Sequence, residues 1–239
     1  MWGQYLSVKV NAVEVFRRDL RRLPPHKRSS TLLLSSVTDA WQGVEKKYGL
    51  ARGVLETLRD EAYPGLVTLL TKSPLVLRDV EVIAALAQKE VGITITTTDD
   101  AMGRFLEVHA PGASDRLRTL AALNKAGIPT YAFVGPLLPH YRYRQDQLEA
   151  LFRQIREAGT RSLFVEHLNS SPYILKRLRP LIDGADAEVR NVYESARTDE
   201  HRQILSEMVL ALAEKYGLEI RLGRVLDHPR DKKSGADRD

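Results

Sequence analysis

Short apolar runs alternate with longer amphipathic runs along this chain. The short runs are apolar almost throughout, which is typical of parallel strands covered on both faces. They predict strands at Leu6–Val10, Thr31–Ser35, Leu66–Thr71, Gly92–Thr97, Pro129–Val134, Ser162–Glu166 and Leu218–Leu222. The longer runs have apolar residues at helical spacing, as at Leu148, Leu151, Phe152 and Ile155. They predict helices at Val13–Arg22, Arg52–Ala62, Val80–Gln88, Ser114–Ala126, Asp146–Ala158, Pro172–Leu181 and Thr198–Tyr216.

This alternation predicts an α/β fold with a parallel sheet and right-handed crossovers. An open doubly wound sheet and a full or partial βα barrel both fit the pattern. No Gly-rich phosphate-binding loop follows a predicted strand, which disfavours the common nucleotide-binding Rossmann fold. We expect one domain over residues 1–227 and a disordered charged tail over residues 228–239.

Composition narrows the range of functions. None of the 239 residues is a cysteine, which excludes disulfides, thiolate nucleophiles and any iron–sulfur cluster ligated by cysteines of this chain alone. The six histidines are scattered, and we expect no metal site. Neither a long apolar run nor a secretory leader is present in the sequence. We therefore expect a cytoplasmic protein that does not bind membranes.

The net charge of +5 is distributed unevenly, and six lysines and arginines lie between Arg17 and Arg28. Basic stretches of this kind contact phosphates, but aromatic residues that stack on bases are not interleaved with them. A solvated helix face is the favoured interpretation. A nucleic-acid partner stays open as the alternative.

Polar residues that follow the predicted strands are the candidate binding residues, because ligands of parallel α/β folds lie at the carboxyl ends of strands. We expect Asp39, Lys72 and the hydroxyls of residues 96–98 to project into one mouth. The set is complementary to a zwitterion, in which the carboxylate would meet an α-amino group, the lysine an α-carboxylate, and the hydroxyls a ribose or a carboxylate. The alternative is that residues 97–100 cap the next helix and that Asp39 caps the helix leading into Glu45.

Two segments, residues 36–45 (SVTDAWQGVE) and 70–79 (LTKSPLVLRD), resemble radical S-adenosylmethionine proteins of the spore photoproduct lyase-like group, often labelled DNA repair photolyases. Residues 8–12, 105–113 and 126–139 fit the same pattern. The resemblance runs from Trp2 to Leu181. It implies a TIM-like partial βα barrel whose strand ends bind S-adenosylmethionine.

The resemblance also implies roles for particular residues. Thr38 and Asp39 would meet the methionine amino group, and Lys72 would meet its carboxylate. The ribose would face Thr96 and Thr97, the adenine would be lined by Val134, Gly135 and Pro136, and Glu166 and Asn169 would lie near cofactor or substrate.

One feature of the family pattern is absent. The group has a CxxxCxxC loop after its first barrel strand, and these thiolates hold a [4Fe–4S] cluster that reductively cleaves S-adenosylmethionine. By this resemblance the sequence lacks both the loop and the first strand, and we expect Met1 to match an internal position of longer family members. We expect the chain alone to be free of the cluster and inactive. We also expect an exposed sheet edge near Thr31–Ser35 or Leu6–Val10.

Three hypotheses follow. The chain is a radical S-adenosylmethionine core domain, or it is a complementing subunit whose companion fragment carries CxxxCxxC, or it is an unrelated cluster-free barrel enzyme. The last would use Glu166, Asp39 and Lys72 for acid–base chemistry. The exposed edge would be covered by a second copy, by the companion fragment or by a rearranged N-terminus. The substrate stays open, although the name of the group points to pyrimidine dimers in DNA.

Overall fold

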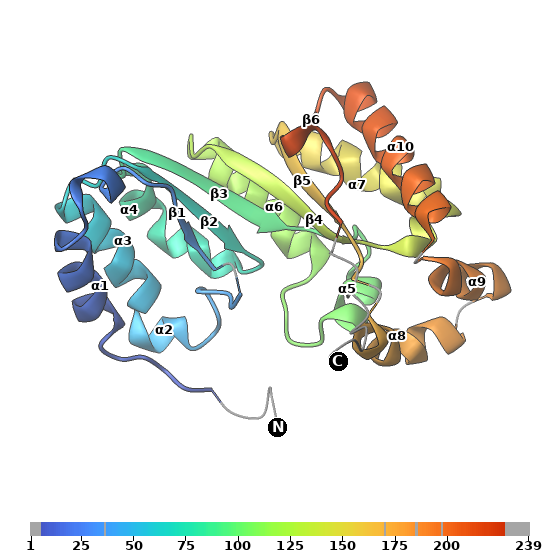
Figure 1. The fold of residues 1–239 in the computed structure, drawn as a ribbon, viewed down its shortest axis with the longest axis horizontal. Coiled ribbons are helices and arrows are strands. Elements are labelled where there is room, and N and C mark those ends of the chain that lie inside the picture. The colour runs from blue at the N-terminus through green and yellow to red at the C-terminus, as the bar shows by residue number, and fades with distance from the viewer. Residues whose placement is uncertain (1–5, 36, 170, 185, 197, 228–239) are drawn as a thin grey trace, which may run out of the picture.

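The computed structural model describes residues 6–35, 37–169, 171–184, 186–196 and 198–227 (Figure 1). Within these ranges, six strands form one parallel sheet in the order β1-β2-β3-β4-β5-β6. They are β1 (Leu32–Leu34), β2 (Leu66–Thr71), β3 (Gln88–Thr94), β4 (Thr130–Leu137), β5 (Ser162–His167) and β6 (Glu219–Ile220). The expected charged tail, residues 228–239, lies outside the described residues.

Helices precede the first strand and connect the successive strands of the sheet. They are α1 (Ala12–Arg21), α2 (Glu45–Tyr48), α3 (Leu50–Asp60), α4 (Val80–Ala84), α5 (Asp100–Leu106), α6 (Ala113–Lys125), α7 (Gln145–Glu157), α8 (Pro172–Gly184), α9 (Ala187–Ser195) and α10 (Asp199–Tyr216). Four 3-10 turns are η1 (Pro25–Lys27), η2 (Pro74–Asp79), η3 (Pro139–Arg142) and η4 (Arg221–Gly223). Figure 1 shows α1 and α3 at the β1 end and α7 and α10 at the β5–β6 end.

The sheet is open, because β1 and β6 lie at opposite ends of the strand order and do not pair. Strand order follows chain order, as in a βα barrel that has not closed. The predicted α/β fold with a parallel sheet is confirmed, and it takes the form of a partial barrel. None of the helices in the described ranges has the length and apolarity that crossing a bilayer requires.

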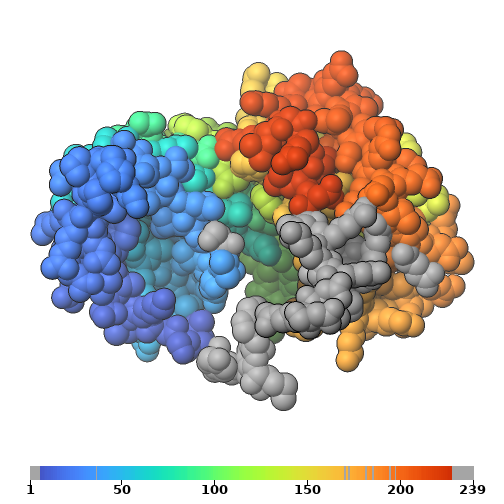
Figure 2. Space-filling view, in the orientation of Figure 1, coloured from blue at the N-terminus to red at the C-terminus, as the bar shows by residue number. Residues whose placement is uncertain are grey.

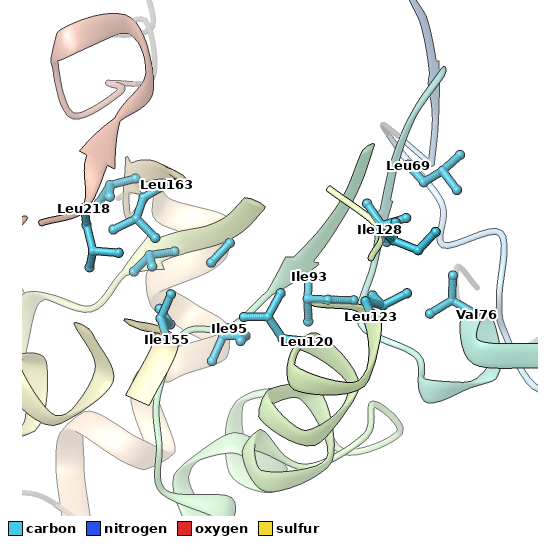
Figure 3. Close-up of a cluster of buried hydrophobic side chains, with 14 of the residues drawn as sticks. Leu69, Val76, Ile93, Ile95, Leu120, Leu123, Ile128, Ile155, Leu163 and Leu218 are labelled. Atoms are coloured by element: carbon cyan, nitrogen blue, oxygen red, sulfur yellow. The ribbon is translucent and has the colours of Figure 1, made fainter. Parts of the chain in front are cut away.

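The main core lies between the sheet and its helices. Leu120 and Leu123 of α6 are fully buried and pack against Ile93 of β3 and Ile95 just beyond it (Figure 3). Alternate residues of each strand face this layer, and the residues between them face the opposite, concave side. The pairing register places Thr68, Glu90 and Gly92 on the concave side.

The concave side is closed at one end by an ion pair. Arg221 donates to both carboxylate oxygens of Glu90, at 3.0 and 2.7 Å, and its guanidinium lies 4.7 Å from the centre of the Tyr131 ring. Tyr131 also lies over Gly92, where an added Cβ would be 2.2 Å from the Tyr131 Cζ atom. Glycine at position 92 thus leaves the space that the Tyr131 ring occupies.

Two predicted elements are wrong. Residues Leu6–Val10 form no strand, because their backbone turns, with Val10 donating to the carbonyl of Val8. The helix predicted over Val80–Gln88 ends at Ala84, and Gln88 already begins β3. Of the apolar residues that gave the helical period, Val82 and Ile83 are buried within α4, and Leu86 is buried in the turn between α4 and β3. Strand β3 also ends at Thr94, before Thr96 and Thr97.

The expected exposed sheet edge is present at β1. Within the described residues, β1 pairs with β2 alone and has no strand on its other side. A groove of about 510 Å³ borders this edge. All three residues of β1 line it, together with residues 6–9 and apolar side chains of α1 and α3. In the space-filling view, the molecule is hollowed between its blue N-terminal elements and its orange C-terminal elements (Figure 2).

Candidate functional site

Asp39 joins the ends of the first two strands. Its carboxylate accepts hydrogen bonds from the Thr71 hydroxyl at 2.7 and 2.9 Å, from the Lys72 backbone N–H at 2.8 Å and from the Trp41 backbone N–H at 2.9 Å. It therefore holds the loop after β1 against the end of β2. Asp39 does not cap α2, which begins at Glu45 with Val44 as its N-cap. Neighbouring Thr38 is exposed and lines the groove beside β1.

A buried charged network continues from this loop. The indole Nε1 of Trp41 donates to the Asp79 carboxylate at 2.9 Å, and Arg78 donates to the same carboxylate at 2.8 and 2.9 Å. Arg78 also donates to Glu45 at 3.1 Å. Burial alone would raise the pKa of Asp79, but donation from Arg78 and Trp41 holds that pKa below its ordinary value. The two segments that carried the family resemblance thus form one structural unit.

Lys72 lies at the end of β2, on the concave side of the sheet. Its ammonium pairs with Oε1 of Glu107, and Oε2 of Glu107 accepts from Arg116 at 2.6 Å. Burial acts to raise the pKa of Glu107, but the charges of Lys72 and Arg116 outweigh burial and lower it. Glu107 is therefore an ionised carboxylate shared between two cations.

Thr96 and Thr97 are buried beyond the end of β3. The carbonyl of Thr96 accepts from the Tyr141 hydroxyl at 2.6 Å, and the Thr97 hydroxyl accepts from the Asp99 N–H at 3.1 Å. Asp99 in turn caps α5 by accepting from the N–H groups of Ala101 and Met102. Capping, the alternative considered for residues 97–100, is thus confirmed for Asp99.

Gly135 and Pro136 lie inside β4, and the peptide bond between them is cis. The strand predicted over Pro129–Val134 therefore ended too early. The register with β5 shifts between Val134 and Leu137, which is where a proline is tolerated in a sheet. A Cβ on Gly135 would lie 2.0 Å from the Phe133 ring, so glycine is required there. Their predicted place against an adenine stays a prediction.

Glu166 and Asn169 come from β5 and the loop after it. Phe164 pairs with Phe133, so Glu166, two residues on, faces the concave side, as Lys72 does. His167 faces the helices instead, and its Nε2 lies 3.0 Å from the Ser206 hydroxyl of α10. Asn169 is exposed and accepts from the Ser171 N–H at 3.1 Å.

The basic stretch lies on α1 and η1, at the outer surface over α3 (Figure 1). Several of its cations bind groups of the protein itself. Arg21 donates to Glu61 at 2.9 and 2.7 Å, Arg18 to Asp19 at 3.0 Å, and Arg17 to Thr57 at 3.4 Å. These contacts favour the solvated-face interpretation, and a nucleic-acid partner stays an untested prediction.

Candidate metal ligands do not gather in the part of the chain that the structure describes. Among the described residues, no group of three or more His, Asp or Glu side chains is arranged to hold a metal ion. Cysteine is absent from the whole sequence. The residues present therefore do not fit a [4Fe–4S] cluster.

Glu107, the partner of Lys72, is not among the residues predicted from the sequence. Arg116 indicates that an anion lies nearby. It shares the face of α6 with Thr119, Leu120 and Leu123, and it is only 3% exposed. An arginine on a buried face requires an anion nearby. Glu107 is that anion, but its position in a loop 35 residues after Lys72 has no periodicity that points to it.

Comparison of the sequence with known proteins finds relatives but no family model. No family model matches the chain. An uncharacterized protein of Mycobacterium tuberculosis is 30% identical over 223 residues, covering 88% of this chain and 64% of the relative. An uncharacterized protein of Methanocaldococcus jannaschii is 31% identical over 138 residues, covering 58% of this chain and 49% of the relative. The chain thus spans less than two thirds of the length of the curated relatives it matches.

Solved structures define the class of fold. Spore photoproduct lyase complexed with dinucleoside spore photoproduct superposes with a TM-score of 0.66 at 15% identity, covering 90% of this chain and 68% of that one. Streptococcus suis SuiB bound to S-adenosylmethionine superposes with a TM-score of 0.51 at 12% identity, covering 75% and 42%. The chain has the partial-barrel fold of radical S-adenosylmethionine proteins. Its resemblance to spore photoproduct lyase is confirmed in the fold, without the CxxxCxxC motif.

Proposed function

We propose that the carboxyl edge of this sheet binds S-adenosylmethionine, as the core domain of a radical S-adenosylmethionine protein of the spore photoproduct lyase-like group. The observation that carries the proposal is the junction of Asp39 with Lys72. The Lys72 backbone N–H donates to the Asp39 carboxylate at 2.8 Å, so the residue that carries the ammonium and the carboxylate lie at the same edge of the sheet. A spore photoproduct lyase variant of the same fold has bound AdoMet, which supports the choice of ligand.

The residues of this chain would bind and orient the cofactor. Lys72 would attract the methionyl carboxylate. The carboxylate of Asp39 already accepts three kinds of donor, so its main contribution is to fix the loop that presents Thr38. Bound S-adenosylmethionine supplies a sulfonium that gives a carbon radical when it is reductively cleaved. The cluster that drives this cleavage has no cysteine ligands in this chain.

Calorimetry with S-adenosylmethionine tests the binding proposal. We expect binding by the wild-type chain and at least tenfold weaker binding by Lys72→Ala, since one charge-assisted contact is worth about 1.5–3 kcal/mol. The matched control is Lys215→Ala on α10, whose ammonium pairs with Glu149 at 2.6 Å on the outer surface. Absent binding, or equal affinity in the Lys72→Ala variant, would contradict the proposal.

A second candidate concerns the activity of the whole protein. We propose that a companion polypeptide carrying CxxxCxxC completes the sheet at β1. The open edge of β1 and the apolar groove of about 510 Å³ beside it favour this candidate. An unpaired parallel edge offers backbone donors and acceptors to an added strand. In this form, the cluster ligands would come from the companion and the cofactor contacts from this chain.

Co-expression tests the second candidate. We expect a complex of this chain with a CxxxCxxC-bearing fragment to hold iron and sulfide after anaerobic reconstitution, and this chain alone to hold none. Val54→Lys places a charge in the groove and should weaken the complex. Val108→Lys makes the same change at an exposed position outside the groove and should not. A stable cluster on this chain alone would contradict the second candidate. So would a complex that Val54→Lys and Val108→Lys weaken equally.

The third hypothesis, an unrelated acid–base enzyme, gains no support from the contacts. Asp39 is engaged by hydrogen bonds and Lys72 by Glu107. Asp39 and Lys72 are therefore held in structural contacts rather than positioned as an acid and a base.

A further inference from the structure

Glu107 connects two cations that come from different parts of the fold. Lys72 reaches it from the end of β2, and Arg116 reaches it from the first half of α6. The side chains of Lys72 and Glu107 are 35% and 26% exposed, whereas that of Arg116 is 3% exposed. The contact with Lys72 therefore lies at the surface of the concave face, and the contact with Arg116 lies behind it.

Arg116 is held in place by contacts of its own, which do not depend on the position of Lys72. Its guanidinium donates to the carbonyl of Pro111 at 2.9 Å and to the carbonyl of Thr94 at 3.2 Å, as well as to Glu107. These three acceptors fix the arginine between β3 and α6. Glu107 is thereby anchored from the protein interior, with its second oxygen directed to the ammonium.

We infer that Glu107 is the positioning residue for Lys72. An unrestrained lysine loses much rotamer freedom when it binds a ligand, and a fixed partner removes part of that loss beforehand. Two cations and one carboxylate also leave one positive charge on the cluster. That charge matches one carboxylate of an incoming ligand, so Glu107 would select ligands with a single α-carboxylate. The identity of the ligand rests on the function proposed above.

The alternative is that Glu107 serves only to neutralise the buried Arg116. The two roles make different predictions for Lys72. If Glu107 only neutralises Arg116, its replacement should change the affinity for every ligand, because the change acts through the fold. If Glu107 positions Lys72, its replacement should change the affinity only for ligands that Lys72 contacts. A cycle of single and double variants separates them.

The first experiment measures the affinity of wild type, Glu107→Gln, Lys72→Ala and the double variant for S-adenosylmethionine and for adenosine, which has no carboxylate. We expect Glu107→Gln to weaken S-adenosylmethionine binding by about tenfold, or about 1.4 kcal/mol. In the Lys72→Ala background, the same change should have no further effect. Adenosine binding should be unchanged throughout, and Glu107→Asp should restore part of the loss. Equal losses in both backgrounds, or an equal loss for adenosine, would overturn the inference.

The second experiment needs no ligand. Acylation of Lys72 by a dilute amine-reactive reagent, mapped by mass spectrometry, should rise several-fold in Glu107→Gln because the ammonium is released. Glu149→Gln should raise the labelling of Lys215 and leave that of Lys72 unchanged, and circular dichroism checks that both variants fold. Unchanged labelling of Lys72 in folded Glu107→Gln would refute the positioning role. If the wild type does not bind S-adenosylmethionine, the proposed function fails, and the labelling still decides the role of Glu107.

Discussion

Individual polar residues near the strand ends mostly have identifiable partners within the protein. Asp39 and Lys72 are predictable from the sequence, because the carboxyl ends of parallel strands share one edge. The residues that bind Asp39 and Lys72 within the protein are harder to predict from the sequence. Trp41 and Glu107 meet these two residues through loops whose paths depend on packing, and Thr71 of β2 meets Asp39 because the loop after β1 folds against the end of β2. A sequence therefore locates such a site better than it assigns the roles of its members.

Three histidines on the helical side of the C-terminal half are buried, and two of them have strongly lowered pKa values. Burial lowers the pKa of His140 and of His201 to about 4, with nearby arginines acting in the same direction. His140 has a partner, since its Nδ1 lies 3.0 Å from the Tyr193 hydroxyl. Within the described residues, neither ring nitrogen of His201 has a hydrogen-bond partner. Both rings are therefore neutral at pH 7.

The free energy of unfolding should fall in mild acid for this reason. Below about pH 6.5, the unfolded chain protonates these histidines while the folded chain does not, so stability is lost as pH falls from about 6.5 toward 4. Each histidine accounts for about 3 kcal/mol at most. Urea titrations across this range should show a smaller loss in His201→Leu than in wild type. Parallel curves for the two proteins would contradict the prediction.

At the scale of elements, the ion network at Asp79 links η2 to the loop after β1 and to α3. Asp79 is fully buried and receives donors from Trp41, Arg78 and Arg52, the last at 3.2 Å. Removing one member of such a network leaves buried charge without a counter-charge. The loop that carries Asp39 would lose its support at the same time.

Asp79→Ala should therefore destabilise the protein by about 3–5 kcal/mol. Asp60→Ala is the matched control, because Asp60 is exposed at the end of α3 and pairs with Arg59 at the surface; it should change stability by less than about 1 kcal/mol. Chemical denaturation of both variants measures the difference. A cost below about 1 kcal/mol for Asp79→Ala would mean that the network relaxes without penalty.

Elements with a clear apolar period were predicted well. The bounds of β2 match exactly, and those of α6 and α7 match within one residue. The incorrect predictions concern apolar runs that form neither a paired strand nor a long helix. Residues 6–9 line the groove instead of pairing, and the apolar residues after Val80 are split between a short helix and a turn. Short helices such as α5, fixed by the Asp99 cap, have too few turns to give a period.

At the scale of the whole molecule, the parallel sheet followed from the alternation of strands and helices. The open edge at β1 was also expected, from the resemblance rather than from any periodicity. Apolar patterning alone does not distinguish an open doubly wound sheet from a barrel, since both bury strands on two faces. The order β1 to β6 required the structure.

That order has a consequence for how the chain folds. Every strand pairs with the strand next to it in sequence, so each added crossover closes a loop of modest length and no strand waits for a distant segment. This pairing keeps the relative contact order lower than in a sheet whose strands pair out of sequence order, and a lower contact order favours faster folding. During synthesis, the N-terminal units can stack in the sequence in which they leave the ribosome, each forming the template for the next.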